Sequence, residues 1–65
     1  MAIELSDRQL EIAQLVAAGL EDKEIAKELN IKYGTVRNHI DRIRLKCGCT
    51  NRAHFVAVLK DLNII

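Results

Sequence analysis

Two cysteines and two histidines are the side chains of this 65-residue chain that could suggest metal chemistry. Cys47 and Cys49 are separated only by Gly48, and the histidines are His39 and His54. A Cys-x-Cys spacing is not the usual one of structural zinc sites. Such close neighbours also rarely form a strain-free disulfide. We therefore expect free, structural cysteines, no bound metal and no cofactor.

The sequence supports no arrangement of side chains for catalysis. It predicts no Ser/His/Asp or Cys/His group, and no paired carboxylates fall in a predictable cleft. His39 is expected to be a partly packed helix residue rather than a base. The prediction is a protein that is not an enzyme and that binds no small molecule within this chain.

Charge is divided unevenly along the chain, whose formal net charge is only +1. Residues 1–31 carry three basic and seven acidic side chains, a net charge of −4. Residues 32–65 carry seven basic and two acidic side chains, a net charge of +5. A basic half joined to an acidic half is what a small DNA-binding domain would show. Charge alone favours that interpretation only slightly over an ordinary solvated surface.

Helices must position these side chains, because helix formers dominate, proline is absent and no stretch alternates strictly between apolar and polar. Ser6 and Gln9 have the spacing of a capping box that begins the first helix. Gly19, Asn30 and Gly48 are suited to the left-handed conformation that ends a helix. The sequence predicts an all-α fold of four helices in one domain of residues 1–65. The helices are expected from Ser6 to Gly19, and at about 22–29, 33–47 and 51–62.

The third predicted helix has an apolar back and a polar front. Its apolar residues recur at steps of four, three and four, so they share one face: Val36, Ile40, Ile43 and Cys47. The opposite face carries Arg37, Asn38, Asp41 and Arg44, with Arg42 towards one edge. A shorter helix and a tight turn at residues 30–32 precede it, which is the order of a helix-turn-helix. The major groove of DNA, about 12 Å wide, admits one helix of this kind. We expect double-stranded DNA as the partner, with the N-terminal half of this helix in the groove.

Several motifs resemble the LuxR-type DNA-binding domain, also called the FixJ or GerE type. Residues 5–9, Leu-Ser-Asp-Arg-Gln, are similar to its opening, and residues 19–26, Gly-Leu-Glu-Asp-Lys-Glu-Ile-Ala, are similar to its Gly-Leu-Ser-Asn-Lys-Glu-Ile-Ala stretch. The stretch Thr-Val-Arg-Asn-His-Ile at residues 35–40 follows in register, as do Ile43, Lys46, Gly48 and Arg52. The resemblance covers about residues 5–59. It implies a bacterial transcription regulator with the third helix as recognition helix and the fourth as the usual dimer contact.

The resemblance also implies roles for individual residues. It places Arg37 and Asn38 among the base-reading positions, and their side chains suit guanine and adenine respectively. Thr35, Lys23 and Lys46 fall where the family tends to contact phosphates, and lysine and threonine suit phosphate oxygens. Each of these residues could instead be an ordinary surface residue, and Thr35 a helix-start residue. Arg52 could bind a phosphate or form a salt bridge with an acid of the first helix.

Some residues depart from the family pattern. Lys32 replaces a common serine cap at the start of the third helix and could add a phosphate contact. With glycine at position 34, the sequence Gly-Thr-Val at residues 34–36 is closer to that of the fourth region of sigma factors. Asp41 stands at a position that is often basic and base-facing, and we leave it out of the DNA contacts.

The last predicted helix is apolar nearly all round, which implies a second partner besides the chain's own core. We expect Ala53, Val56 and Leu59 to face the core. Phe55, Val58 and Leu62 are expected to form the interface of a homodimer, although all three could also be core residues.

The expected function is sequence-specific DNA binding as a transcription regulator. Two alternatives stay open: a protein-interaction module that antagonises another LuxR-type regulator, and a sigma-factor-like fragment that binds promoter DNA. No apolar run is long enough to span a membrane, and the first residues have neither a basic start nor a hydrophobic signal core. We therefore expect a cytoplasmic location and no membrane partner.

Overall fold

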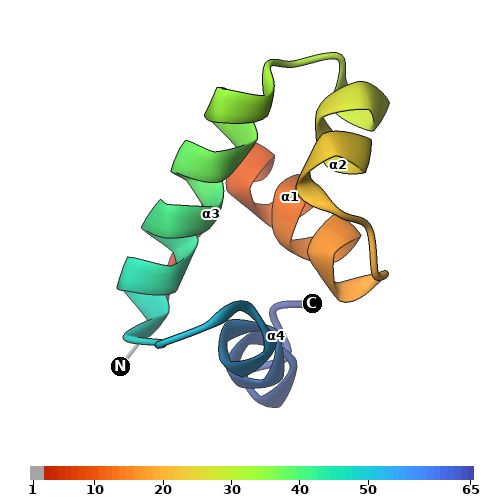
Figure 1. Cartoon of the computed structure of the whole chain (residues 1–65). Helices are drawn as coiled ribbons and strands as arrows, with labels where there is room; N and C mark the ends of the chain where they lie inside the picture. Colours follow the sequence, from red (N-terminus) through yellow and green to blue (C-terminus); the bar gives the residue numbers. More distant parts are fainter. Residues whose placement is uncertain (1–2) are drawn as a thin grey trace.

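The computed structural model describes residues 3–65, and all regular structure within them is helical (Figure 1). The helices are α1 (Asp7–Ala17), α2 (Asp22–Leu29), α3 (Tyr33–Cys47) and α4 (Arg52–Asp61). The all-α prediction of four helices is confirmed, and the helix ends lie close to those expected. The first two residues of the predicted domain, Met1 and Ala2, lie outside the described residues.

The N-terminal caps of α1 and α4 follow from short polar side chains. Ser6 Oγ accepts a hydrogen bond from the Gln9 backbone N–H at 3.1 Å, and Gln9 Oε1 accepts one from the Ser6 backbone N–H at 3.1 Å. This is the expected capping box, which satisfies two backbone donors reciprocally. At α4, Asn51 Oδ1 accepts from the His54 backbone N–H at 2.8 Å. Asn51 is therefore the N-cap of α4.

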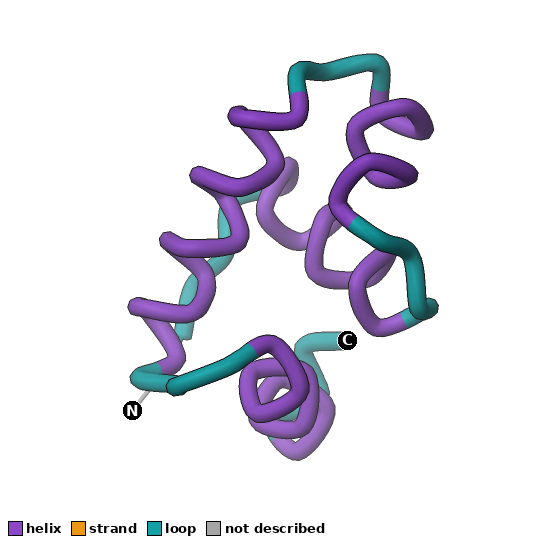
Figure 2. The backbone as a smooth tube through the Cα atoms, in the orientation of Figure 1, coloured by secondary structure: helices purple, strands orange, loops and turns teal. Residues whose placement is uncertain are grey.

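Left-handed residues stop the first three helices, as expected. Gly19 follows α1 with φ of 95°, Asn30 ends α2 with φ of 54°, and Gly48 ends α3 with φ of 66°. A left-handed residue lets backbone N–H groups turn back to the last carbonyls of the helix. The loops between the helices are accordingly short (Figure 2).

The core is shared by all four helices, and α3 packs against each of the other three (Figure 1). α4 lies at the lower end of the molecule in this view, below α1, α2 and α3. The apolar back of α3 is buried as predicted, because Val36, Ile40 and Ile43 all lie in the core. The buried cluster consists of Ile12, Ala13, Val16, Ile25, Ala26, Val36, Ile40, Ile43, Cys49, Phe55 and Leu59.

The burial of α4 corrects two expectations. Phe55 was assigned to a dimer interface, but its side chain is completely buried in the chain's own core. It is therefore not available to a second copy of the chain. Ala53, expected in the core, is exposed, whereas Val56 is half-buried against the core. The buried stripe of α4 is Phe55 and Leu59, one turn apart, because burying the large aromatic ring removes the most apolar surface from water.

Candidate nucleic-acid interface

The segment from α2 to α3 has the geometry of a helix-turn-helix. Only Ile31 and Lys32 separate the left-handed Asn30 from the first residue of α3. The Ile31 backbone N–H donates to Ala26 O at 3.0 Å, and the half-buried Ile31 side chain packs against the core. Lys32 O accepts from the Val36 backbone N–H at 3.2 Å, which begins α3. The turn is therefore fixed by its own backbone and by one apolar anchor.

The expected DNA-contacting side chains are exposed around the apolar back of α3. Arg37 and Asn38 are both exposed, directly after the buried Val36. Thr35 lies in the first turn of α3, and Lys32 is its N-cap residue. Lys23, in the first turn of α2, lines a shallow depression together with Tyr33 at the start of α3. One surface of the molecule thus presents the start of α2 together with the start of α3.

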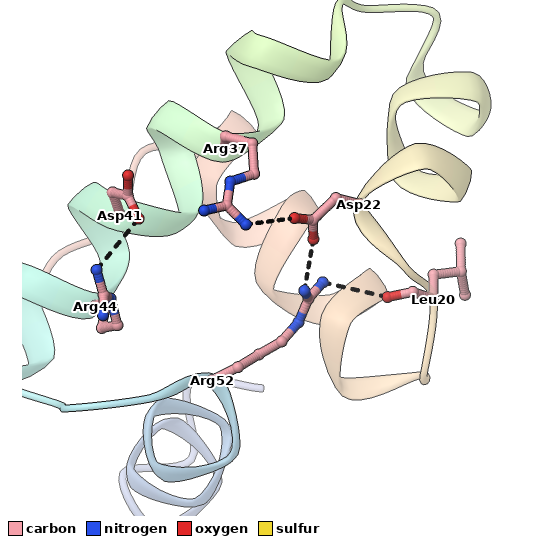
Figure 3. A network of polar contacts seen from close by, with 6 residues as sticks. All are labelled: Leu20, Asp22, Arg37, Asp41, Arg44 and Arg52. Atoms are coloured by element: carbon pink, nitrogen blue, oxygen red, sulfur yellow. Dashed lines mark hydrogen bonds and ion pairs between the residues drawn. The ribbon is translucent and has the colours of Figure 1, made fainter.

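Arg37 is held by a carboxylate from another helix (Figure 3). Arg37 Nη1 donates to Asp22 Oδ2 at 3.2 Å, and the second oxygen of Asp22 forms an ion pair with Arg52 Nη1 at 2.6 Å. Arg52 Nη2 also donates to Leu20 O at 3.3 Å. The hydrogen bond with Asp22 raises the pKa of Arg37 above its ordinary value. This network joins α2, α3 and α4.

Asp22 is the site residue that sequence reasoning missed. In the sequence it stands out only as one residue of the LuxR-like stretch at residues 19–26, yet its side chain is just 9% exposed. The expectation for Arg52 was a phosphate or an acid of the first helix, and the acid it meets belongs to α2. The one available signal was an aspartate where the LuxR-type pattern has asparagine.

Lys46 lies at the other end of α3 and contacts the start of α1. Its Nζ donates to Glu4 O at 3.0 Å and to Gln9 Oε1 at 2.7 Å. Lys46 therefore ties the end of α3 to the capping box of α1. The ammonium group has three N–H donors, so one remains for the predicted phosphate contact.

Asp41 and Arg44 form a second, more open ion pair on α3 (Figure 3). Arg44 Nη2 donates to Asp41 Oδ1 at 3.3 Å, and Arg44 Nη1 donates to Thr50 O at 3.3 Å. The Asp41 side chain is 49% exposed, unlike the buried carboxylate of Asp22. Arg44 therefore braces the loop between α3 and α4 as well as neutralising Asp41.

The two cysteines are free, with Cys47 half-buried and Cys49 buried. Cys49 Sγ donates a weak hydrogen bond to Cys47 O at 3.5 Å. Burial raises the pKa of the Cys47 thiol, with a smaller contribution from Cys49. A neutral, partly buried thiol of this kind behaves as a small apolar side chain. Within residues 3–65, no three His, Cys, Asp or Glu side chains gather in a way that could hold a metal ion.

The helices of residues 3–65 are all too short or too polar to cross a lipid bilayer. The order of α2 and α3, a short helix, a tight turn and a longer helix with an exposed basic and amide-bearing front, defines a helix-turn-helix domain.

The comparisons with known proteins specify the family. The model of the family described as bacterial regulatory proteins, luxR family, matches residues 4–59. The chain therefore belongs to the LuxR family. The transcriptional regulatory protein DesR of Bacillus subtilis is 47% identical over 57 residues, which cover 88% of this chain and 29% of DesR. The transcriptional regulatory protein TdiR of Thauera aromatica is 47% identical over 55 residues, which cover 80% of this chain and 24% of TdiR.

Two solved structures share the fold. The structure of the transcription factor GerE superposes with a TM-score of 0.89 at 33% identity, covering 98% of this chain and 94% of that one. The response regulator ChrA of a heme-sensing two-component system superposes with a TM-score of 0.92 at 31% identity, covering 100% of this chain and 32% of that one. The chain spans less than a third of the length of DesR and TdiR.

Proposed function

We propose that this domain binds double-stranded DNA sequence-specifically, with α3 in the major groove, and acts in bacterial transcription regulation. The observation that carries the proposal is the division of α3 into a buried apolar back and an exposed front that holds Arg37 and Asn38. A helix docked in the groove needs such a front to form hydrogen bonds with base edges. Membership of the LuxR family supports the same proposal. This role also implies a cytoplasmic location.

The proposed contacts divide into those that read bases and those that fix the position of the domain. Arg37 would donate two hydrogen bonds to guanine, and Asn38 would pair with adenine through its donor and acceptor together. Phosphate contacts carry little sequence information but set the register of the protein on the duplex. The residues proposed for phosphate contacts are Lys23, Lys32, Thr35 and Lys46.

The domain is proposed to act as a homodimer through α4. Because Phe55 is buried in the chain's own core, the contacts proposed for the dimer are Val58 and Leu62. Leu62 is 46% exposed and Val58 is half-buried. Two recognition helices related by a two-fold axis would enter successive major grooves about 34 Å apart. The preferred site would then be an inverted repeat. We further propose that residues 1–65 form one domain, which in the relatives named above is part of a longer chain.

The proposal is tested by selecting bound duplexes from a random-sequence pool at two salt concentrations. A two-fold-symmetric motif should be enriched, and affinity should fall steeply with salt because bound protein releases counterions from DNA. Arg37→Ala should then reduce the preference for one base pair by about 10- to 100-fold. If folded protein retained no duplex even at low salt, DNA binding would be refuted.

A further inference from the structure

We infer that Asp22 is the positioning residue that sets how Arg37 presents its guanidinium to DNA. This inference rests on the proposed function, in which Arg37 reads a base. It deepens that function by assigning part of the sequence specificity to a buried acid on α2, outside the recognition helix.

The carboxylate of Asp22 is the fixed partner in its pair with Arg37. Its side chain is 9% exposed, whereas that of Arg37 is 52% exposed. Asp22 is the first residue of α2, where the positive end of the helix dipole favours a negative charge. The ion pair with Arg52 Nη1 holds its other oxygen. Because Asp22 is anchored from several sides and Arg37 is not, Asp22 constrains Arg37 rather than the reverse.

The hydrogen bond leaves Arg37 able to read a base. A guanidinium has five N–H donors in a rigid fork. One donor of Nη1 is directed to Asp22 Oδ2 at 3.2 Å, so the others stay available to guanine O6 and N7. The long side chain is thereby held in a reduced set of rotamers before DNA arrives, which lowers the entropy lost on binding.

The pair formed by Asp41 and Arg44 on the same helix provides a contrast. Asp41 is 49% exposed, and its partner Arg44 lies three residues away on α3 itself. This carboxylate is thus neither buried nor held by another helix. Asp41 nevertheless lies close to Arg37, because both line one depression on the surface, so it is not the control. Asp7 is the matched residue: like Asp22 it is the first residue of its helix, but its side chain is exposed and α1 lies outside the helix-turn-helix. Asp7→Asn makes the same chemical change as Asp22→Asn without releasing Arg37 from its hydrogen bond.

Two explanations of Asp22 lead to opposite results. An acid that merely lies near the DNA repels phosphates, so its neutralisation should raise affinity for every sequence alike. A positioning acid fixes Arg37, so its neutralisation should reduce discrimination at the base pair that Arg37 reads, without lowering the affinity for random duplex. Asparagine suits position 22, because it is the residue of the LuxR-type pattern there, and Asp22→Asn should therefore fold.

The experiment compares wild type with Asp22→Asn, Arg37→Ala, the double variant and the control Asp7→Asn. Each is measured by urea unfolding and by binding to the selected duplex, to its single-base variants and to random duplex. We expect Asp22→Asn to lower the preference at one base pair about fivefold, the difference between a charged and a neutral hydrogen-bond partner. In the Arg37→Ala background, the same change should alter that preference less than about twofold. The control should leave it unchanged.

The inference is overturned if Asp22→Asn shifts the affinity for all duplexes equally, or if its effect on the preference is as large without Arg37. Either result leaves DNA binding by the domain intact. If wild type shows no sequence preference at all, the proposed function itself fails and the inference falls with it.

Discussion

Truncation of Phe55 to alanine should remove a large part of the domain's free energy of unfolding, because this side chain is a core residue and not an interface residue. Phe55 is completely buried, as are Leu59 on the same helix and Ile12, Ile25 and Ile43 on the other three. Removing a buried phenyl ring costs about 3–5 kcal/mol in transfer and cavity free energy. A chain of 65 residues has a total stability of only about 3–10 kcal/mol, at roughly 0.05–0.15 kcal/mol per residue.

The free energy of unfolding should therefore be measured by urea denaturation with far-ultraviolet circular dichroism. Phe55→Ala should lower the midpoint strongly or leave no folded baseline. Phe55→Leu, which keeps most of the volume, should lose less than about 1.5 kcal/mol and remain folded. Leu45→Ala is the matched control, because Leu45 is 78% exposed and its truncation should change stability by less than about 0.5 kcal/mol.

Self-association of Phe55→Leu separates the two roles of this residue. Sedimentation of the folded variant should give the same dimer dissociation constant as wild type, because the ring faces the chain's own core. If Phe55→Leu kept its stability but lost self-association, or if Phe55→Ala cost no more than Leu45→Ala, the assignment of Phe55 to the core would be wrong.

Three further results are expected. Leu62→Glu should give a monomer in sedimentation and weaken binding to a two-half-site duplex, while binding to one half-site stays unchanged; a persistent dimer would exclude this part of α4. Gly48→Ala should cost about 1–2 kcal/mol in urea unfolding because φ is +66° there, whereas Gly34→Ala, within helical backbone and open space, should stabilise by about 0.5–1 kcal/mol. Half-maximal alkylation of native Cys47 should require a higher pH than half-maximal alkylation of the same thiol in the urea-unfolded chain, because burial raises the thiol pKa; an equal or lower midpoint would contradict that cause. Because the pKa of Cys47 is higher in the folded state, the stability gained by burying the neutral thiol is lost as pH rises through the folded-state pKa.

The helices and their ends could be predicted because their causes are local. Ser6 and Gln9 meet within one turn, and Asn30 and Gly48 take left-handed conformations that depend only on their own backbone. The apolar back of α3 could likewise be predicted, since Val36, Ile40 and Ile43 recur at helical spacing and face one way. Local hydrogen bonds and periodicity leave few alternatives in such segments.

The orientation of α4 could not be predicted in the same way. Apolar residues surround this helix, so its periodicity does not indicate which stripe is buried. The choice is made by the other helices, whose core accepts Phe55 and Leu59 and leaves Ala53 exposed. The anchor of Arg37 was hidden for a related reason, because Asp22 lies 15 residues away and meets it only in the folded chain. Position on a helix face predicts exposure, but it does not predict a partner on another helix.

The position of Asp22 changes what the uneven charge of the chain means. Residues 1–31 carry a net charge of −4, yet one of their carboxylates, that of Asp22, is used inside the fold, where it meets two arginines of the basic half. Arg37 near a fixed carboxylate attracts phosphates less than a free arginine would, but it is better defined in direction. Lys23 and Lys32, both exposed, are then left to supply more of the salt-dependent attraction. We therefore expect one copy of the domain to bind DNA weakly but selectively, so that strong binding requires two copies on an inverted repeat.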